Sequence, residues 1–164
     1  MTSGACDPFR MSTPPKARVR KALAYCIDGD RLLVLRHVDF GPEEVGIQVP
    51  GGSIRDGESP VAAALRELVE ETGRTEFALV ADLGMDAYDI TPHRDEVQER
   101  HFVLFRPTAA LPGRWSCEEA HDGVGAPTRL EAFWIPLARA HVLQAGQGQR
   151  LWKAVEVLGG LQPS

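Results

Sequence analysis

One short helix with clearly marked ends stands between strand-forming runs, and it constrains the fold of this chain more than any other feature. Ser59 suits the N-cap, Pro60 suits the first helical position, and Gly73 suits the left-handed C-cap. The alanines and leucines between these ends favour the helical conformation. The sequence therefore predicts a helix that begins at Ser59-Pro60 and closes at Gly73.

Strand-forming runs lie on both sides of this helix. The turn Asp28-Gly29-Asp30 separates two of them and predicts a hairpin. The expected strands are residues 22–27, 31–36, 78–83, 97–105 and 130–135, with a short extended piece at 47–49. A hairpin combined with strands that alternate with helices favours a mixed sheet with helices packed against it, in the α/β (α+β) class.

The remaining segments complete this outline. Residues 107–129 are rich in glycine and proline, so we expect a long irregular excursion there. A short helical turn is expected over residues 136–142 and a last helix over 150–158. A chain of 164 residues has the size of one domain, and no second boundary is visible. We therefore expect a flexible tail at 1–16, with Met11 as an alternative start, and a single domain at 17–164.

Composition and charge limit the partners. The net charge of −5 argues against binding to duplex nucleic acid. No segment reaches the length of a membrane span and no secretory signal is recognisable, so a cytoplasmic location is expected. The three cysteines, Cys6, Cys26 and Cys117, are an odd number without metal-type spacing and indicate inert thiols in a reducing compartment.

Three glutamates crowd the end of the helix. Successive helical residues are about 100° apart, so Glu67, Glu70 and Glu71 share roughly one third of the circumference. Glu70 and Glu71 lie in the last turn, where the helix dipole disfavours negative charge. A solvated acidic surface is the alternative, but Mg²⁺ or Mn²⁺ would offset this cost and suit oxygen ligands on one face. An apolar stripe lies nearly opposite, and we expect it to face the core: Val61, Leu65 and Leu68.

A longer pattern surrounds these glutamates. The pattern consists of Gly52, Glu58, Arg66, Glu67, Glu70, Glu71 and Gly73. Five residues separate Gly52 from Glu58, and seven separate Glu58 from Arg66. It resembles the signature of the Nudix hydrolases, a family that includes MutT and the ADP-ribose pyrophosphatases. The preceding Val49-Pro50-Gly51 and the later Trp134-Ile135-Pro136-Leu137 are also similar to family members.

The resemblance implies a fold and an activity. The fold would be an α/β/α sandwich with a mixed sheet. Members of the family use divalent ions to hydrolyse the pyrophosphate bond of a nucleoside diphosphate linked to another group. By position, Glu70 and Glu71 are expected to be the principal metal ligands, and Glu67 a further ligand or the base that acts on the attacking water. The backbone carbonyl of Gly51 is expected to contribute a ligand, and Arg66 to support catalysis by orienting the carboxylates.

Other positions of the pattern are expected to be structural. Glu58 should form an ion pair with Arg66, and the glycines Gly52, Gly57 and Gly73 should serve the backbone. Arg74 departs from the pattern, since the family usually has an aliphatic residue there, and we expect local repacking. Gln48 also differs, because many members have an aromatic or aliphatic residue at that place.

Residues outside the pattern supply further candidates. A fourth acidic ligand or a base often comes from a distant loop, and the candidates are Glu96, Glu99, Glu118, Glu119 and Asp122, with Glu118/Glu119 preferred. The candidates for contacts with substrate phosphate or base are Arg36, His37, Arg100 and His101. Trp115 or Phe40 would suit stacking on a nucleobase, although packing in the core is the commoner role of such residues.

The leading functional hypothesis is a Mg²⁺-dependent Nudix pyrophosphohydrolase with a small nucleotide-type substrate. The alternatives are a non-catalytic ligand sensor or regulator on the same fold, and a different enzyme on this fold, such as an isomerase or a decapping-type hydrolase. The intact pattern disfavours the sensor. A homodimer is compatible with the family, and the sequence leaves the substrate open.

Overall fold

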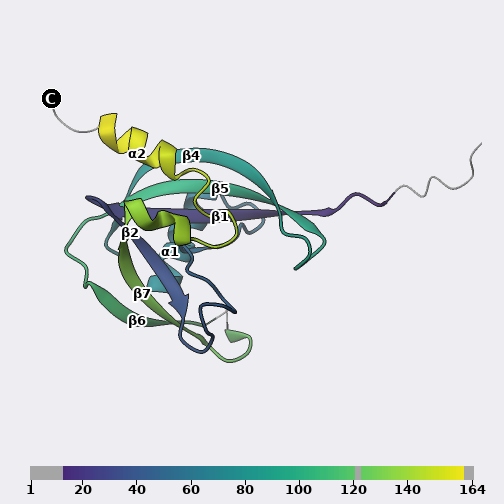
Figure 1. Ribbon diagram of the computed structural model, residues 1–164, viewed down its shortest axis with the longest axis horizontal. Coiled ribbons are helices and arrows are strands. Elements are labelled where there is room, and N and C mark those ends of the chain that lie inside the picture. The colour runs from purple at the N-terminus through teal and green to yellow at the C-terminus, as the bar shows by residue number, and fades with distance from the viewer. Residues whose placement is uncertain (1–12, 121–122, 161–164) are drawn as a thin grey trace, which may run out of the picture.

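Long strands are the most prominent elements of the molecule (Figure 1). The computed structural model describes residues 13–120 and 123–160. The elements are β1 (Ala17–Asp28), β2 (Arg31–His37), β3 (Gly51–Ser53), α1 (Pro60–Thr72), β4 (Phe77–Asp89), β5 (Glu96–Pro107), β6 (Arg114–Glu119), β7 (Thr128–Pro136), η2 (Leu137–Val142) and α2 (Leu151–Gly160). Three of the features considered above lie outside the described residues: Cys6, Met11 and Asp122. No helix in the described ranges is long and apolar enough to cross a membrane.

Seven strands form one mixed sheet, as predicted. The order is β4-β5-β1-β2-β7-β6, and β3 pairs with β1. β1 and β5 run parallel, whereas the other pairings of these strands are antiparallel. The hairpin between β1 and β2 turns at Asp28 to Arg31, where the sequence predicted it. The parallel pair places β1 at the centre of the sheet, between β5 and β2.

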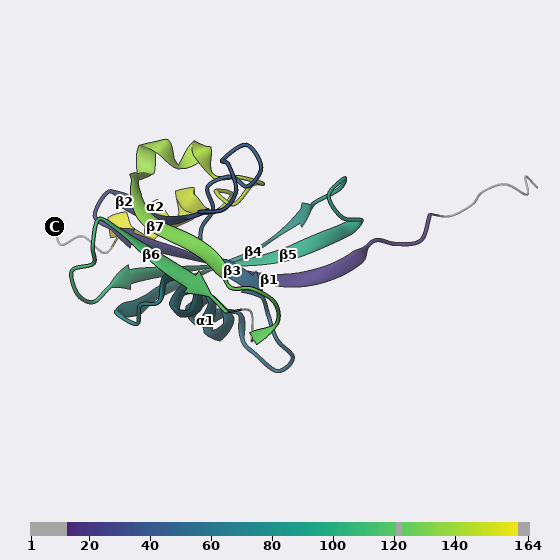
Figure 2. The same cartoon turned by 90° about the horizontal axis from the view of Figure 1, so that it is seen from below.

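Helices cover both faces of this sheet (Figure 2). Side chains alternate along β1, so Ala24 packs in the cluster under α1 while Leu23 and Tyr25 pack in the cluster under α2 and η2. Phe102 and Leu104 of β5 belong to the second cluster as well. The predicted sandwich of helices around a mixed sheet is therefore confirmed.

The ends of α1 match the sequence prediction. Ser59 Oγ accepts a hydrogen bond from the Ala62 N–H at 3.1 Å, and Pro60 is the first helical residue. Gly73 adopts a left-handed conformation at φ 65°, and its N–H donates to the Val69 carbonyl at 2.9 Å. The helix therefore has the start and the stop that its capping residues dictate.

The predicted core face of α1 is only partly correct. Leu68 is fully buried and Val61 packs against the core, as expected, but Leu65 is 38% exposed. The buried face consists of Ala63, Ala64, Glu67, Leu68, Glu71 and Thr72. Small alanines let the helix lie close to the sheet, and this rotation turns two glutamates inward. The apolar stripe alone did not reveal this inward turn, because those carboxylates have polar partners in the interior that compensate for their burial.

Two further predictions need correction. The segment 107–129 is not wholly irregular, because it contains β6 and the first residues of β7. β6 alternates between exposed and half-buried residues, so its hydrophobic signal is weak. β4 extends to Asp89, well beyond the predicted end at residue 83, and passes through a register shift between Asp82 and Gly84. Gly84 adopts φ 84°, a conformation that breaks the expected strand pattern.

Candidate metal centre and active site

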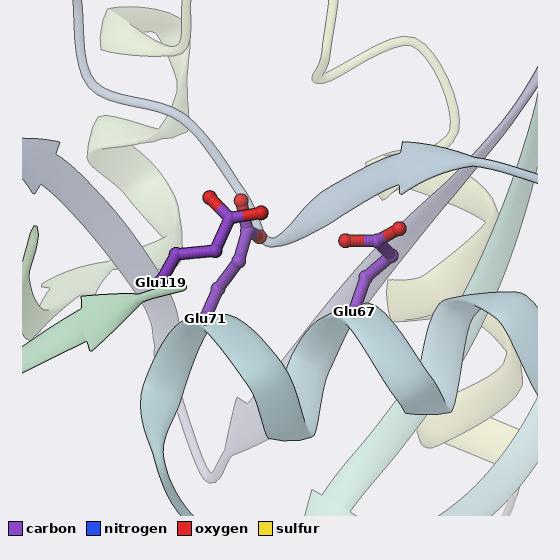
Figure 3. Close-up of side chains that lie close together, drawn as sticks. All are labelled: Glu67, Glu71 and Glu119. Atoms are coloured by element: carbon purple, nitrogen blue, oxygen red, sulfur yellow. The ribbon is translucent and has the colours of Figure 1, made fainter. Parts of the chain in front are cut away.

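Three carboxylates converge beside the C-terminal half of α1 (Figure 3). Glu67 and Glu71 lie one helical turn apart, and Glu119 reaches them from the end of β6. One oxygen from each lies within 4.8 Å of the others. Glu67 and Glu71 are each only 6% exposed. A cluster of carboxylate oxygens at this spacing, with two of the three residues buried, fits a hard divalent cation.

Gly52 of β3 makes room for the carboxylate of Glu67, and the neighbouring Gly51 makes room for Leu23. A Cβ atom at Gly52 would overlap the Glu67 carboxylate, and one at Gly51 would overlap Leu23. The Gly51 N–H donates to Glu71 Oε2 at 2.8 Å. Gly51 sits opposite Leu23 between two hydrogen-bonded positions, Pro50 O to Ala24 N and Arg20 O to Ile54 N. Its carbonyl therefore points away from β1, on the same side as its N–H.

The electrostatics of the cluster favour a bound cation. Burial raises the pKa of Glu71 well above its ordinary value, and the neighbouring carboxylates of Glu119 and Glu67 raise it further, against the hydrogen bond from Gly51. Burial also raises the pKa of Glu67, although the Arg66 guanidinium opposes this change. Like charges held this close repel one another, and a divalent ion would relieve that repulsion.

Arg66 organises the surrounding acids. Its Nε donates to Glu58 Oε1 at 2.8 Å and its Nη2 to Glu58 Oε2 at 3.0 Å, which forms the predicted ion pair in a two-pronged geometry. Nη1 donates to Glu67 Oε1 at 2.6 Å, and Nη2 also donates to the Ser53 carbonyl at 3.0 Å. One guanidinium thus links the loop before α1, the strand β3 and the carboxylate cluster.

Glu70 lies at the edge of the cluster. Its side chain is 40% exposed, accepts a hydrogen bond from Arg66 at 3.2 Å and approaches Arg55 at 3.8 Å. It lines the same pocket of about 490 Å³ as Glu67 and Glu119. The pocket is open to solvent between α1, the loop after β3 and the end of β6. The role of Glu70 as a metal ligand stays a prediction.

The structure separates the other acidic candidates. Glu119 joins the cluster, whereas its neighbour Glu118 lies on the rim of the pocket. Glu99 forms an ion pair with Arg18 at 2.9 Å, and Glu96 accepts a hydrogen bond from Gln98 at 3.2 Å. The preference for the Glu118/Glu119 pair therefore selected the segment that supplies the third carboxylate, although the sequence did not distinguish its two members.

The aromatic candidates have structural contacts. Trp115 Nε1 donates to the Thr72 carbonyl at 2.8 Å, and its ring packs against the core beneath α1. The Arg74 guanidinium lies 5.7 Å from the centre of that ring, so the unusual arginine packs on Trp115 where an aliphatic residue was expected. Phe40 is half exposed and contacts the ring of His37 edge-on at 6.0 Å.

The basic candidates are dispersed. Arg36 pairs with Glu131 at 2.7 Å, and His37 Nε2 lies 3.2 Å from Gln48 Nε2. His101 is half-buried in β5, and burial lowers its pKa. Arg100 is buried in the same strand and lines a different pocket. Two residues that line the carboxylate pocket, Ser53 and Arg55, were not predicted, because nothing in the sequence sets them apart from ordinary loop residues.

Comparison with models of known protein families identifies the domain that contains this site. A family model described as the NUDIX domain matches residues 17–156, which is most of the chain. The chain belongs to the Nudix family. The matched range covers every strand and helix that builds the site, so the carboxylate cluster is part of the Nudix domain itself.

Curated relatives and solved structures add detail. An RNA pyrophosphohydrolase of Brucella ovis (strain ATCC 25840 / 63/290 / NCTC 10512) is 49% identical over 47 residues, which are 28% of this Nudix chain and 26% of the relative. The chain thus matches about a quarter of the length of that relative. A NUDIX hydrolase from Nitrosomonas europaea superimposes with a TM-score of 0.57 at 18% identity, over 87% of this chain and 89% of that one. The E. coli dihydroneopterin triphosphate pyrophosphohydrolase gives 0.55 at 16% identity, over 89% and 97%. At these identities the solved structures support the fold.

Proposed function

We propose that this protein is a pyrophosphohydrolase that depends on Mg²⁺ or Mn²⁺ and cleaves a nucleoside diphosphate linked to another group. The observation that carries the proposal is the convergence of Glu67, Glu71 and Glu119 within 4.8 Å beside the Gly51 backbone. The Nudix family membership and the relatives named pyrophosphohydrolases support the same reaction class.

The residues present fit a divalent ion. Glu67, Glu71 and Glu119 would hold it, together with the Gly51 carbonyl, and Glu70 would join from the edge of the pocket. When bound, the ion supplies positive charge that neutralises the phosphoryl oxygens as the pyrophosphate bond breaks. The carboxylate side chains are acceptors only, so they match a hard cation better than a soft one.

The chain's own side chains would position the water and receive its proton. Arg66 engages Glu67 through Oε1 only, which leaves Oε2 of Glu67 to accept a proton from the attacking water. Glu119 is the second carboxylate of the cluster that could serve as this base. Arg66 acts as a positioning residue, because its bonds to Glu58 and Ser53 hold the guanidinium still while it holds Glu67.

Chromatographic separation of the nucleotide products tests the proposal. Nucleoside triphosphates, nucleotide sugars, dinucleoside polyphosphates and coenzymes would be compared with Mg²⁺, with Mn²⁺ and with EDTA. We expect hydrolysis of at least one class that requires metal and that Glu71→Gln reduces by about a hundredfold or more, as for loss of a group that stabilises the transition state. Glu156→Gln, on the exposed side of α2, is the matched control and should be unchanged. A folded protein that binds metal and hydrolyses nothing would favour the sensor alternative.

A further inference from the structure

Two further pockets lie on the sheet face opposite α1. The smaller pocket, of about 150 Å³, lies against Gly51 and Gly52 and is lined by Lys21 and Leu23 of β1. The larger pocket, of about 780 Å³, lies between the loop that joins β4 to β5 and the segment 144–147. Arg100 lines both of them, as do Gln98 and Gln147. The two hollows therefore adjoin, and the smaller one reaches the same glycines that contact the metal centre.

Arg100 is a buried cation with neutral partners. It is 4% exposed, and its Nε donates to Gln98 Oε1 at 2.9 Å. Nη1 donates to the Ala145 carbonyl, and the Tyr88 ring lies 4.1 Å from the guanidinium carbon. Among residues 13–120 and 123–160 no carboxylate forms an ion pair with Arg100. A buried charge without an opposite charge costs stability, so a side chain held in this way points to an anionic ligand.

Lys21 brings a second positive charge to the same place. It is the direct register partner of Arg100 across the parallel pair β1–β5, so both side chains emerge on one face. Its Nζ donates to Ser53 Oγ at 2.8 Å. Burial lowers the pKa of Lys21, and the charges of Arg94 and Arg100 lower it further, whereas Glu96 and Glu67 oppose them. Arg94 and Arg100 therefore both lie within electrostatic reach of Lys21.

Glu96 and Glu67 partly offset the charge of Lys21, whereas no carboxylate among residues 13–120 and 123–160 forms an ion pair with Arg100. Asp89 lines the larger pocket but is held by Lys16 at 2.6 Å. Glu44 lies at the opposite wall, on the exposed loop before β3. Arg94, at the rim of the larger pocket, adds a positive charge at the entrance. An anion that enters would meet Lys21 and Arg100 at the inner end, next to Gly51 and Gly52.

We propose that Lys21 and Arg100 bind a phosphoryl group of the substrate that is additional to the diphosphate at the metal centre. This inference rests on the proposed function and names its substrate class. A polyphosphate chain of three or more phosphates would lie along the Gly51–Gly52 backbone, between the carboxylate cluster on one side and the two cations on the other. Substrates whose second group is a neutral sugar would leave both cations without a partner and would be disfavoured.

Inorganic tripolyphosphate in EDTA is the probe for this subsite, measured by calorimetry. Without metal, the carboxylate cluster repels phosphate, so binding reports the cations. We expect Arg100→Gln and Lys21→Gln each to weaken binding by about tenfold or more, as for loss of a charge-assisted hydrogen bond. Arg106→Gln, an exposed arginine of the same strand, removes an equal charge and should change binding by less than about twofold. Equal affinities in all variants, or no binding by the parent protein, would overturn the proposal.

Hydrolysis rates then separate this inference from the proposed function. In the parent protein, kcat/KM for a nucleoside triphosphate should exceed that for a nucleotide linked to a neutral sugar, and Lys21→Gln should abolish this preference mainly through KM. Preference for the neutral sugar would refute the subsite while leaving the hydrolase intact. Tripolyphosphate binding that depends on Lys21, in a protein without hydrolase activity, would support the subsite and refute the hydrolase. Thermal melts show whether each variant is folded. If Arg100→Gln is unfolded, tripolyphosphate binding and the substrate preference of Lys21→Gln test the subsite.

Discussion

Gly52 lies directly against Glu67, so that any side chain at position 52 would overlap the carboxylate of Glu67. This contact couples the backbone of β3 to the buried face of α1. It also explains why a glycine is needed at this point of the motif, for reasons of space rather than of backbone conformation.

Replacing this glycine should therefore damage the metal centre. We expect Gly52→Ala to displace Glu67, to lower the free energy of unfolding by about 1–3 kcal/mol and to weaken metal binding. Chemical denaturation and Mn²⁺ titration would measure the two effects. Gly113→Ala is the matched control, since a Cβ there meets nothing within 4 Å. Equal behaviour of the two variants would contradict the close approach.

The contribution of β6 can be tested with two adjacent glutamates. Glu119→Gln removes a carboxylate of the cluster, whereas Glu118→Gln removes the same charge from the rim of the pocket. We expect Glu119→Gln to weaken Mn²⁺ binding by at least about tenfold, which is the lower range for perturbed metal sites. Glu118→Gln should have a smaller effect that salt screens further. Calorimetry in low and high salt would measure both, and equal losses would show that only the local charge matters.

The Glu58–Arg66 pair should make stability depend on pH. The Arg66 hydrogen bonds, followed by the Arg55 N–H, lower the pKa of Glu58 to about 2 in the folded state. In the unfolded chain the carboxyl titrates near its ordinary value of about 4.3. The stabilisation is therefore fully present above that value and is lost as the pH falls toward 2.

Glu58→Gln isolates this effect. We expect the variant to be less stable than the parent by about 1–2 kcal/mol at pH 7, because a charge-assisted pair becomes a neutral one. The difference should shrink as the pH falls from about 4.5 toward 2. Urea denaturation across this range measures it. A difference that does not vary with pH would show that Glu58 contributes by packing alone.

Cys26 and Cys117 should react slowly with thiol reagents in the folded protein. Burial raises the pKa of Cys26 to about 12 and, together with the charge of Glu71, raises that of Cys117 to about 11. At pH 8 both remain protonated, and the thiol is a poor nucleophile. In a Cys6→Ser background we expect slow reaction with a disulfide reagent in the native state and rapid reaction of both thiols in urea. Rapid native labelling would contradict this.

Much of the fold could be predicted from local sequence signals. The caps of α1 at Ser59 and Gly73 act over a few residues, so the sequence alone located its ends. The turn at Asp28 to Arg31 and the long apolar runs of β1 and β5 act in the same local way. β6 could not be predicted, because its alternating polar residues gain their partners only from pairing with β7.

Some features of the candidate site also follow from local sequence signals, whereas others depend on the tertiary structure. The sequence by itself determined the family, the carboxylates of α1, the Glu58–Arg66 pair and the need for Gly51 and Gly52, since these positions lie within one continuous motif. The tertiary structure alone decided that Glu67 and Glu71 face inward, that Glu119 joins them, and that Lys21 stands beside Arg100. Those relationships depend on helix rotation and strand register, which are set by packing between distant segments and leave no local trace in the sequence.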